Sequence, residues 1–384
     1  MPADIMATEL TGTAYHIIIK TPAGIVQAFQ TDFLSIDISS KVNGVGLARI
    51  KMDYGAISVP YYILDAQVDI YRVNLRLNIP DYIEFTGLFR KKVVSTDTDG
   101  RTFFEAHVLG IRHILTRRIV AYPGNFPGAS LFTNMRGETI MKTIVYQNLI
   151  AHTGFRANFT NSDIAGVSNE TDGGRGPLLD WKCPWKNGLT ELVALSKLCN
   201  SDFDLLKTGA NSYQFVYKNG PMGTDRSASI FFSLHLGNMA KPKYTFDATN
   251  EATVAIVGGR NIGQKRKYAV YKGGTYDAVT NNIEMWVDAR ESDTTAYLYS
   301  KASVALFRAM ARNQVEFEVI QTFGSAYGRD YFLGDFVTAY YASLTFKQKV
   351  IGVTLNFAAE SQKELITIDL RDTDSGPIDF INES

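Results

Sequence analysis

The sequence predicts a β-rich α+β fold, and three observations lead to this prediction. Short runs of alternating apolar residues, separated by turn residues, fill the first third of the chain. Two stretches with apolar residues at helical spacing occupy the middle third. Strand patterns return from Lys243 onward and are interrupted by one helix. Because 384 residues exceed one typical core, we expect two or three packed units, which the changes of pattern place at residues 1–124, 125–242 and 243–384.

The first predicted domain begins with a compact β-rich run at residues 15–19. Asn43 and Gly44 then supply the turn chemistry that joins the two strands of a hairpin. The alternation over residues 66–71 places Ala66 and every second residue after it on one face of a strand. These features predict consecutive strands joined by tight turns.

The next strand is expected to turn Ile83 and Phe85 to one face, and Tyr82 and Glu84 to the other. An Asp-Gly pair at residues 99–100 follows between two apolar runs and predicts a second hairpin. Several short strands with regular turns are typical of a small barrel or a sandwich.

The middle portion is expected to be α+β. Prolines at 123 and 127 mark its beginning, and a helix is predicted from Glu138 until Gly154 supplies a stop. The polar, Gly-rich stretch 161–177 predicts a surface loop. A second helix is then indicated by a stripe of apolar residues, followed by an alternating pair of strands. The stripe consists of Leu189, Leu192, Leu195 and Cys199, and the strands pass through 203–205 and 213–217.

The last portion predicts strands around one strong helix near residues 293–312, with Ser292 or Asp293 as its N-cap. The buried stripe of this helix is expected to comprise Leu298, Ala302, Ala305 and Ala309. Strands are predicted in 332–340, 351–357 and 366–370, and a loosely held tail after Asp372. One weak echo links the two β-rich ends. Asp81-Tyr82 with Gly87 and Asp330-Tyr331 with Gly334 each open a strand pair.

Composition argues against several functional classes. Hydrophobic residues make up 45% and charged residues 20% of the chain, which is ordinary for a globular protein. Lys plus Arg equals Asp plus Glu at 39 each, so the net charge is zero and does not indicate binding to nucleic acid or to an anionic membrane. No apolar run reaches the length of a membrane span, and the N-terminus lacks a signal peptide. We therefore expect a soluble protein made in a cytoplasm, with Cys183 and Cys199 as buried thiols.

The patterns that usually carry chemistry are weak. The Gly-rich stretch 258–265 has Gln264 where a phosphate-binding loop needs Lys, so a hairpin or bulge is predicted. Residues 96–100 resemble a calcium loop only faintly, and the hairpin interpretation is favoured. No histidine lies at metal-ligand spacing, and no Ser or Cys nucleophile motif occurs. The five histidines are His16, His107, His113, His152 and His235. We predict no catalytic, cofactor-binding or metal-binding residue, and no cofactor.

Three aromatic or cyclic residues leave two interpretations open. Trp181, Pro184 and Trp185 could form a sugar-stacking platform on an exposed loop. The favoured alternative is that they pin the loop against the second helix, because buried aromatic residues dominate packing.

Several short motifs, taken together, resemble siphophage tail hub proteins. The first barrel of that family is matched by 84–90, by 99–100 and by 115–120. A later family segment is matched by 271–274 with 287–290, and the closing barrel by 327–328 with 330–338. Each motif is short, and their order along residues 10–370 carries the resemblance.

The resemblance implies the hub fold shared with myophage baseplate hubs and type VI spike proteins. It implies two small hub-type β-barrels per chain, with an intervening α+β portion, and a homotrimer that presents six similar barrels. Such a non-enzymatic tail-tip ring would join the hexameric tail tube or distal tail ring to a central spike or fibre. Viral DNA would pass through it transiently without specific binding. The virion tail tip would be its location. Since the chain stops at Ser384, we expect any wall-cutting activity to belong to another protein or to be absent.

Two alternatives come from other functional classes. A tail-borne enzyme that degrades cell walls or glycans would use a carboxylate pair that sequence alone does not reveal. A receptor-binding tip protein would expose the aromatic residues of the stretch 161–185.

Overall fold

The computed structural model describes residues 12–121, 130–151, 166–183, 185–260, 266–290 and 293–371. The chain divides into two compact units. The sheet unit comprises residues 1–111, 223–245 and 313–373, and the mixed unit comprises 112–222, 246–312 and 374–384. The fold is β-rich α+β, as predicted. The division into domains at residues 124 and 242 stays a prediction.

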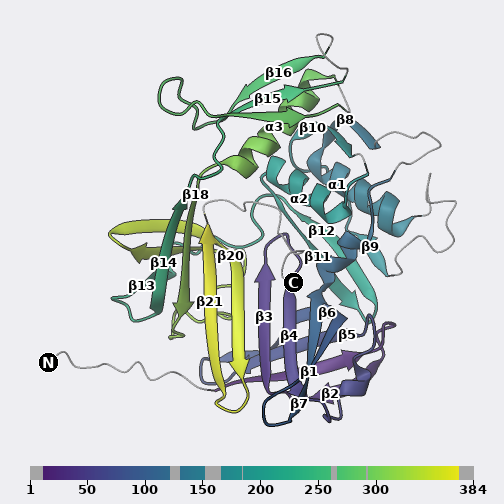
Figure 1. Cartoon of the computed structure of the whole chain (residues 1–384), viewed down its shortest axis with the longest axis vertical. Helices are drawn as coiled ribbons and strands as arrows, with labels where there is room; N and C mark the ends of the chain where they lie inside the picture. Colours follow the sequence, from purple (N-terminus) through teal and green to yellow (C-terminus); the bar gives the residue numbers. More distant parts are fainter. Residues whose placement is uncertain are drawn as a thin grey trace. The chain divides into compact units, whose positions relative to one another are not determined.

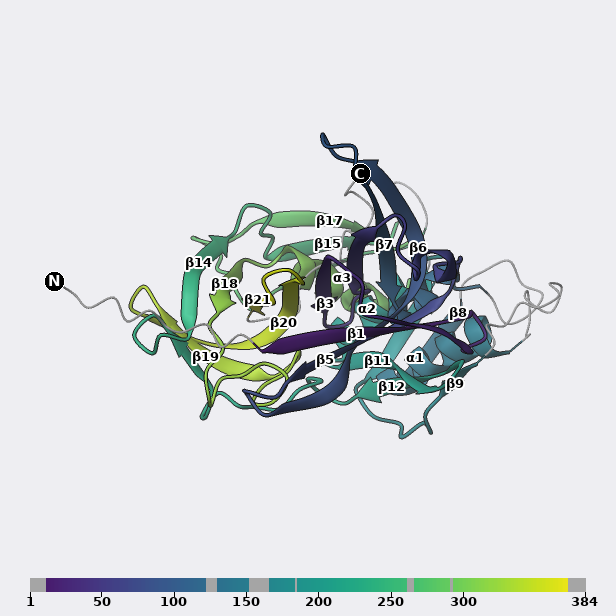
Figure 2. The same cartoon turned by 90° about the horizontal axis from the view of Figure 1, so that it is seen from below.

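The first half of the sheet unit, residues 12–111, contains seven strands. They are β1 (Thr13–Lys20), β2 (Val26–Gln30), β3 (Ser35–Lys41), β4 (Leu47–Asp53), β5 (Gln67–Asn74), β6 (Ile79–Thr96) and β7 (Thr102–Gly110). A short 3₁₀ helix, Val59–Tyr61, precedes β5. The two predicted hairpins are confirmed. Asn43 adopts a left-handed φ of 55° between β3 and β4, and β6 and β7 run on together as a long hairpin (Figure 2).

The second half, residues 223–245 and 313–371, contributes six strands. They are β13 (Phe231–Ser233), β14 (Met239–Asp247), β18 (Arg312–Val319), β19 (Phe336–Tyr341), β20 (Leu344–Ala358) and β21 (Lys363–Arg371). β20 pairs antiparallel with β3 of the first half, with Leu355 opposite Ile38 (Figure 1). The two halves therefore share one sheet of 13 strands in the order β14-β18-β21-β20-β3-β4-β7-β6-β5-β1-β2, with β13-β19 attached to β20. The two predicted β-barrels are not found as closed barrels among the described strands, because β3 and β20 join the two halves into one sheet.

The first part of the mixed unit, residues 112–222, holds two of the predicted helices and two small sheets. Helix α1 (Gly137–Val145) continues into a π-helical turn, Tyr146–Ile150, and α2 is Gly188–Leu198. The sheets pair β8 (Ser130–Arg136) with β10 (Leu178–Cys183), and β11 (Asp202–Gly209) with β12 (Ser212–Lys218) and β9 (Val167–Asn169). A 3₁₀ segment, Ile111–Arg117, opens the unit. Helix α2 begins where the Asn187 carboxamide oxygen accepts hydrogen bonds from the backbone of Leu189 and Thr190.

A third sheet of the mixed unit packs against the last helix. Its strands are β15 (Val254–Gly258), β16 (Tyr268–Lys272) and β17 (Glu284–Asp288), and the helix is α3 (Thr295–Ala309) (Figure 1). The predicted N-cap is wrong, because the hydroxyl of Thr294 accepts from the Tyr297 backbone; Ser292 lies outside the described residues. Leu298 and Ala302 are buried as expected, and Tyr297 and Leu306 join them in the core.

Some sequence expectations fall on residues that are not described. These are the prolines at 123 and 127, Gly154, His152, Pro184, residues 161–165 of the predicted loop and the tail from 372. The described part of the chain has no helix that is long and apolar enough to cross a membrane.

Candidate functional site: two buried ionic clusters

A bulge in β6 prepares the first cluster. Ile70 of β5 lies opposite Phe85 and Tyr71 lies opposite Ile83, so Glu84 is an extra residue in β6. Because a bulge interrupts alternation, Ile83 is 45% exposed while Phe85 is 6% exposed. The prediction that these two residues share a face is therefore wrong. Tyr82 and Glu84 do face each other, and the Tyr82 hydroxyl donates to the Glu84 carboxylate.

Arg72 of β5 is the centre of this cluster and is fully buried. Its Nε and Nη2 donate to the two carboxylate oxygens of Glu364 in β21, each at 2.7 Å. Its Nη1 donates to the Tyr327 carbonyl oxygen at 3.0 Å. The Tyr15 hydroxyl also donates to Glu364, at 2.5 Å. This bidentate pair joins the first half of the sheet unit to the second.

Glu84 is a second carboxylate beside the same guanidinium. It accepts hydrogen bonds from the hydroxyls of Tyr82 and Tyr327. Burial raises the pKa of Glu84 to about 6, although Arg72 and the hydroxyls oppose the change. Burial also acts to raise the pKa of Glu364, but attraction to Arg72 and the hydrogen bonds from Arg72 and Tyr15 leave it lowered. The pKa values of the two acids therefore differ because Glu364, and not Glu84, accepts the two hydrogen bonds from the Arg72 guanidinium.

Gly328 lets the second half approach this cluster. Its φ is 88°, and an added Cβ would lie 2.5 Å from the Tyr82 hydroxyl oxygen and 2.8 Å from Arg72 Nη1. Only glycine fits both the left-handed backbone and this close approach. Tyr82 and Tyr331, the two tyrosines of the sequence echo, both contribute to the surroundings of Arg72.

Sequence reasoning missed Arg72 and Glu364, although each has a local signal. Arg72 continues the buried stripe of Val68 and Ile70 by one step. Glu364 likewise precedes Ile366 and Ile368 on the buried face of β21. Alternate residues of such a strand are buried. A charged residue at one of the buried positions predicts a buried partner of opposite charge.

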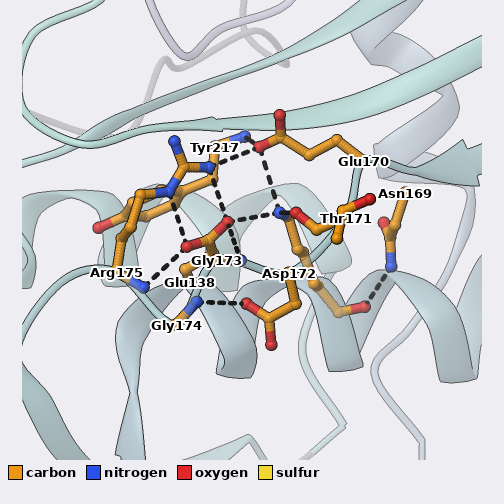
Figure 3. Close-up of polar contacts among 10 residues, drawn as sticks. Glu138, Asn169, Glu170, Thr171, Asp172, Gly173, Gly174, Arg175 and Tyr217 are labelled. Atoms are coloured by element: carbon orange, nitrogen blue, oxygen red, sulfur yellow. Dashed lines mark hydrogen bonds and ion pairs between the residues drawn. The ribbon is translucent and has the colours of Figure 1, made fainter.

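The second cluster lies in the mixed unit and is centred on Glu138, in the first turn of α1 (Figure 3). The Glu138 carboxylate accepts from Nε of Arg175 at 2.8 Å, from its Nη2 at 2.7 Å and from Lys142 Nζ at 2.5 Å. The backbone amides of Gly173 and Arg175 donate to the same group. These donors outweigh the effect of burial and lower the pKa of Glu138.

Glu170 extends this cluster toward β12. It accepts from Arg175 Nη2 at 2.9 Å and from the Tyr217 backbone amide at 2.7 Å, and it lies 3.2 Å from Lys142 Nζ. Hydrogen bonds from the Tyr217 amide and Lys142, and the charges of Lys142 and Arg175, lower its pKa against the effect of burial. The Lys142 ammonium also donates to the Thr171 carbonyl at 2.7 Å. The described part of the predicted loop, residues 166–177, is therefore a short strand and a segment fastened to α1 and β12 (Figure 3).

The sequence of this chain matches a known protein family. The family model of siphovirus ReqiPepy6 Gp37-like proteins matches residues 30–368. The chain belongs to this family of phage tail proteins. The resemblance to a phage tail family is confirmed at this level, and membership places the protein in the virion tail. No match was found among curated proteins.

Several solved structures are similar in fold to this tail protein. The 43 kDa tail protein of prophage MuSo2 from Shewanella oneidensis has a TM-score of 0.59 at 12% identity, over 94% of this chain and 98% of that chain. The tail protein from Neisseria meningitidis MC58 has a TM-score of 0.56 at 11% identity, over 94% and 96%. A chain of the lidded Francisella PdpA-VgrG complex gives 0.53 at 10% identity, over 97% of this chain and 55% of that chain.

The remaining candidate residues of this tail protein differ in their surroundings. Trp181 is buried, and its Nε1 donates to Glu191 of α2 at 3.0 Å, which confirms the packing interpretation for this residue. Trp185, by contrast, is 49% exposed. The Asp97 carboxylate accepts from the amides of Asp99 and Arg101, which confirms the hairpin at residues 96–100.

The structure also tests the predictions for the Gly-rich stretch and the two cysteines. β15 and β16 pair antiparallel on either side of residues 259–267, which confirms the predicted hairpin; residues 261–265 lie outside the description. Cys183 and Cys199 are buried free thiols, as predicted. Among the described residues, no group of three or more His, Cys, Asp or Glu side chains could hold a metal ion. The predicted lack of catalytic, cofactor and metal residues stays a prediction.

Proposed function

We propose that this tail protein is a non-enzymatic hub at the tail tip, in which three copies form a ring with six-fold-like symmetry. The observation that carries the proposal is the sheet unit. It is built from two mainly antiparallel halves that share one sheet and one core and are joined by the Arg72–Glu364 pair. Each half corresponds to one barrel-like element of the ring. Three copies would then present six such elements to a hexameric tube and a three-fold surface to a spike or fibre.

Exposed apolar residues at two places in the sheet unit support contacts between copies. At β2, the last strand of the order, they include Val26 and Phe29, and near β13, which is attached to β20 through β19, they include Phe231, Leu234 and Leu236. A head-to-tail contact that closes a ring would cover both groups of residues. Pro242 lies in β14, the other terminal strand of the order, and disfavours the addition of another strand at that edge. A contact at the β14 edge would therefore be made by side chains.

The charges of the two ionic clusters also support a structural role. A glycan-cleaving pair needs one carboxylic acid with a raised pKa and a water-accessible partner. Glu138 and Glu170 have lowered pKa values and are held by cations, whereas Glu84 and Glu364 share a buried arginine. These carboxylates therefore fit a structural role better than a role in acid catalysis. The balanced net charge fits passage of DNA without specific binding.

Light scattering coupled to size exclusion tests the proposal. The monomer mass is 42.6 kDa, so we expect a particle of about three times this mass. Phe29→Asp should lower the mass toward the monomer, because it places a charge in the proposed contact. Val279→Asp is the control, because Val279 is exposed in the mixed unit. A monomer that remains monomeric with its purified tail-tube partner would contradict the hub.

A further inference from the structure

The three-stranded sheet of the mixed unit has one covered face and one open face. α3 packs against the face formed by Ala255 and Val257 of β15 and their neighbours on the outer strands. The opposite face carries a row of three side chains across the strands, because Ile256 pairs with Val270 of β16 and with Trp286 of β17. Val270 and Trp286 are exposed. The open face is therefore aromatic and apolar at its centre.

The Arg266 side chain and the strand backbone at Gly258 lie against the Trp286 indole. The Arg266 guanidinium lies 5.0 Å from the indole centroid and donates to the carbonyl oxygens of Gly258 and Gly259 at 2.8 and 2.9 Å. A Cβ at Gly258 would lie 2.5 Å from the indole and 2.6 Å from the guanidinium carbon. The missing side chain of Gly258 thus lets Arg266 and the indole lie against the strand. Even so, Trp286 remains 55% exposed, so a ligand can reach it.

Polar groups surround this aromatic centre on both sides. Tyr268, which is 70% exposed, and Asp288 flank Gly258, while Lys272 and Glu284 flank Val254. Asp288 is paired with Arg266 and with Arg290. Three cations, Lys272, Arg266 and Arg290, face two carboxylates, Glu284 and Asp288, so the face has a net charge of only one and offers hydrogen-bond donors and acceptors without attracting a strongly charged ligand.

The size of the face limits what it binds. Three strands about 4.8 Å apart, with five residues each at about 3.3 Å per residue, give a surface on the order of 150 Å². A stable protein partner covers about 800 Å² on each side. The face alone is too small for such a partner but matches a short saccharide. A sugar ring has an apolar C–H side that stacks on an exposed aromatic ring, and hydroxyls that reach the polar rim.

We propose that the open face of β15, β16 and β17 binds a neutral saccharide, with Trp286 as the stacking platform and Tyr268, Lys272 and Glu284 as hydrogen-bonding partners. This inference is independent of the trimeric ring. It assigns a glycan-contacting role to the mixed unit at a place other than the Trp181–Trp185 segment considered from the sequence.

Saturation-transfer NMR with chitotriose, maltotriose and cellotriose tests this site. We expect at least one trisaccharide to bind the intact chain with half-saturation at about 1 mM or tighter. Trp286→Ala should weaken binding about tenfold or more. Gly258→Ala should also weaken it, because the added methyl group displaces the indole while the tryptophan remains. Trp185→Ala, which removes another exposed tryptophan, should bind like the wild type.

Circular dichroism and thermal unfolding establish that each variant is folded before binding is compared. The absence of a saturable signal for all three sugars at about 10 mM overturns the proposal. Equal losses in Trp286→Ala and Trp185→Ala overturn it as well. If Trp286→Ala leaves sugar binding intact but changes the particle mass, the face contacts protein and the saccharide assignment is wrong.

Discussion

Arg72 and Glu364 are 292 positions apart in the sequence, yet they form two parallel hydrogen bonds of 2.7 Å inside one sheet unit. Both side chains are almost completely buried. Removing two charges from water costs several kcal/mol per ion, and the bidentate geometry together with the Tyr15 and Tyr82 hydroxyls offsets that cost. The pair therefore specifies how the two halves meet more than it adds net stability.

Loss of one partner of this pair should be severe. Arg72→Met leaves the Glu364 carboxylate buried without its cation, and we expect the free energy of unfolding to fall by about 3–5 kcal/mol. The double variant Arg72→Met/Glu364→Leu should recover much of this loss, because neither member of the pair is then left as an unpaired buried charge. Urea unfolding monitored by circular dichroism measures both. Lys347→Ala, which removes an exposed ion pair with Asp225, is the control and should have little effect.

Glu84 should make stability depend on pH in a narrow range. Its pKa is raised from 4.5 to about 6 in the folded protein, so the folded state holds a proton that the unfolded state releases. The corresponding stability, about 2 kcal/mol, is fully present below about pH 4.5 and is lost as the pH rises through about 6. Glu84→Gln should remove this slope. Glu138 and Glu364, whose pKa values are lowered, lose their contribution only as the pH falls below 4.5.

Unfolding free energies between pH 4.5 and 7 in wild type and Glu84→Gln measure this prediction. Parallel curves for the two proteins would show that Glu84 titrates normally.

The Glu138 cluster should control the mobility of residues 169–175. A hydrogen bond to a charged group contributes about 1.5–3 kcal/mol, and Glu138→Ala removes several. We expect the amides of Gly173 and Arg175 to exchange hydrogen about tenfold faster or more, as measured by NMR or mass spectrometry. Asp172→Asn, in the same segment, changes one exposed carboxylate that accepts from Gly174 and should leave exchange at Arg175 unchanged.

The two thiols should be unreactive in the native protein. Burial raises the pKa of Cys199 to about 12 and also raises that of Cys183, so little thiolate exists at neutral pH. Labelling with a thiol reagent should proceed only after addition of denaturant. Rapid labelling of either cysteine without denaturant would mean that the core around α2 opens easily.

Features determined by neighbouring residues could be predicted from the sequence, whereas features that join distant segments could not. The hairpins at Asn43 and at Asp99, and the helices α1 and α2, follow from local turn and spacing signals. The pairing of β3 with β20 has no local signal, because either strand would fit beside many others. The N-cap of α3 differed from the prediction because Ser, Asp and Thr are all suitable caps, and their neighbours decide among them.

The ionic clusters illustrate the same limit. The bulge at Glu84 is a tertiary adjustment that brings a carboxylate beside Arg72, and strict alternation does not predict it. The stripe of Val68, Ile70 and Arg72 nevertheless contained a usable signal, which was an arginine at a core position. Trp286 gave no comparable signal, because an aromatic residue in a strand fits a buried face and an open one equally well.

The connection of β3 to β20 has a consequence for synthesis on the ribosome. At about 5–20 residues per second, roughly 15–60 s pass between the translation of Arg72 and that of Glu364. Throughout this interval the nascent first half has a strand edge without its partner and an arginine without its counter-ion. Burying that arginine before Glu364 is made would be costly, which disfavours closure of the nascent half around an incomplete core.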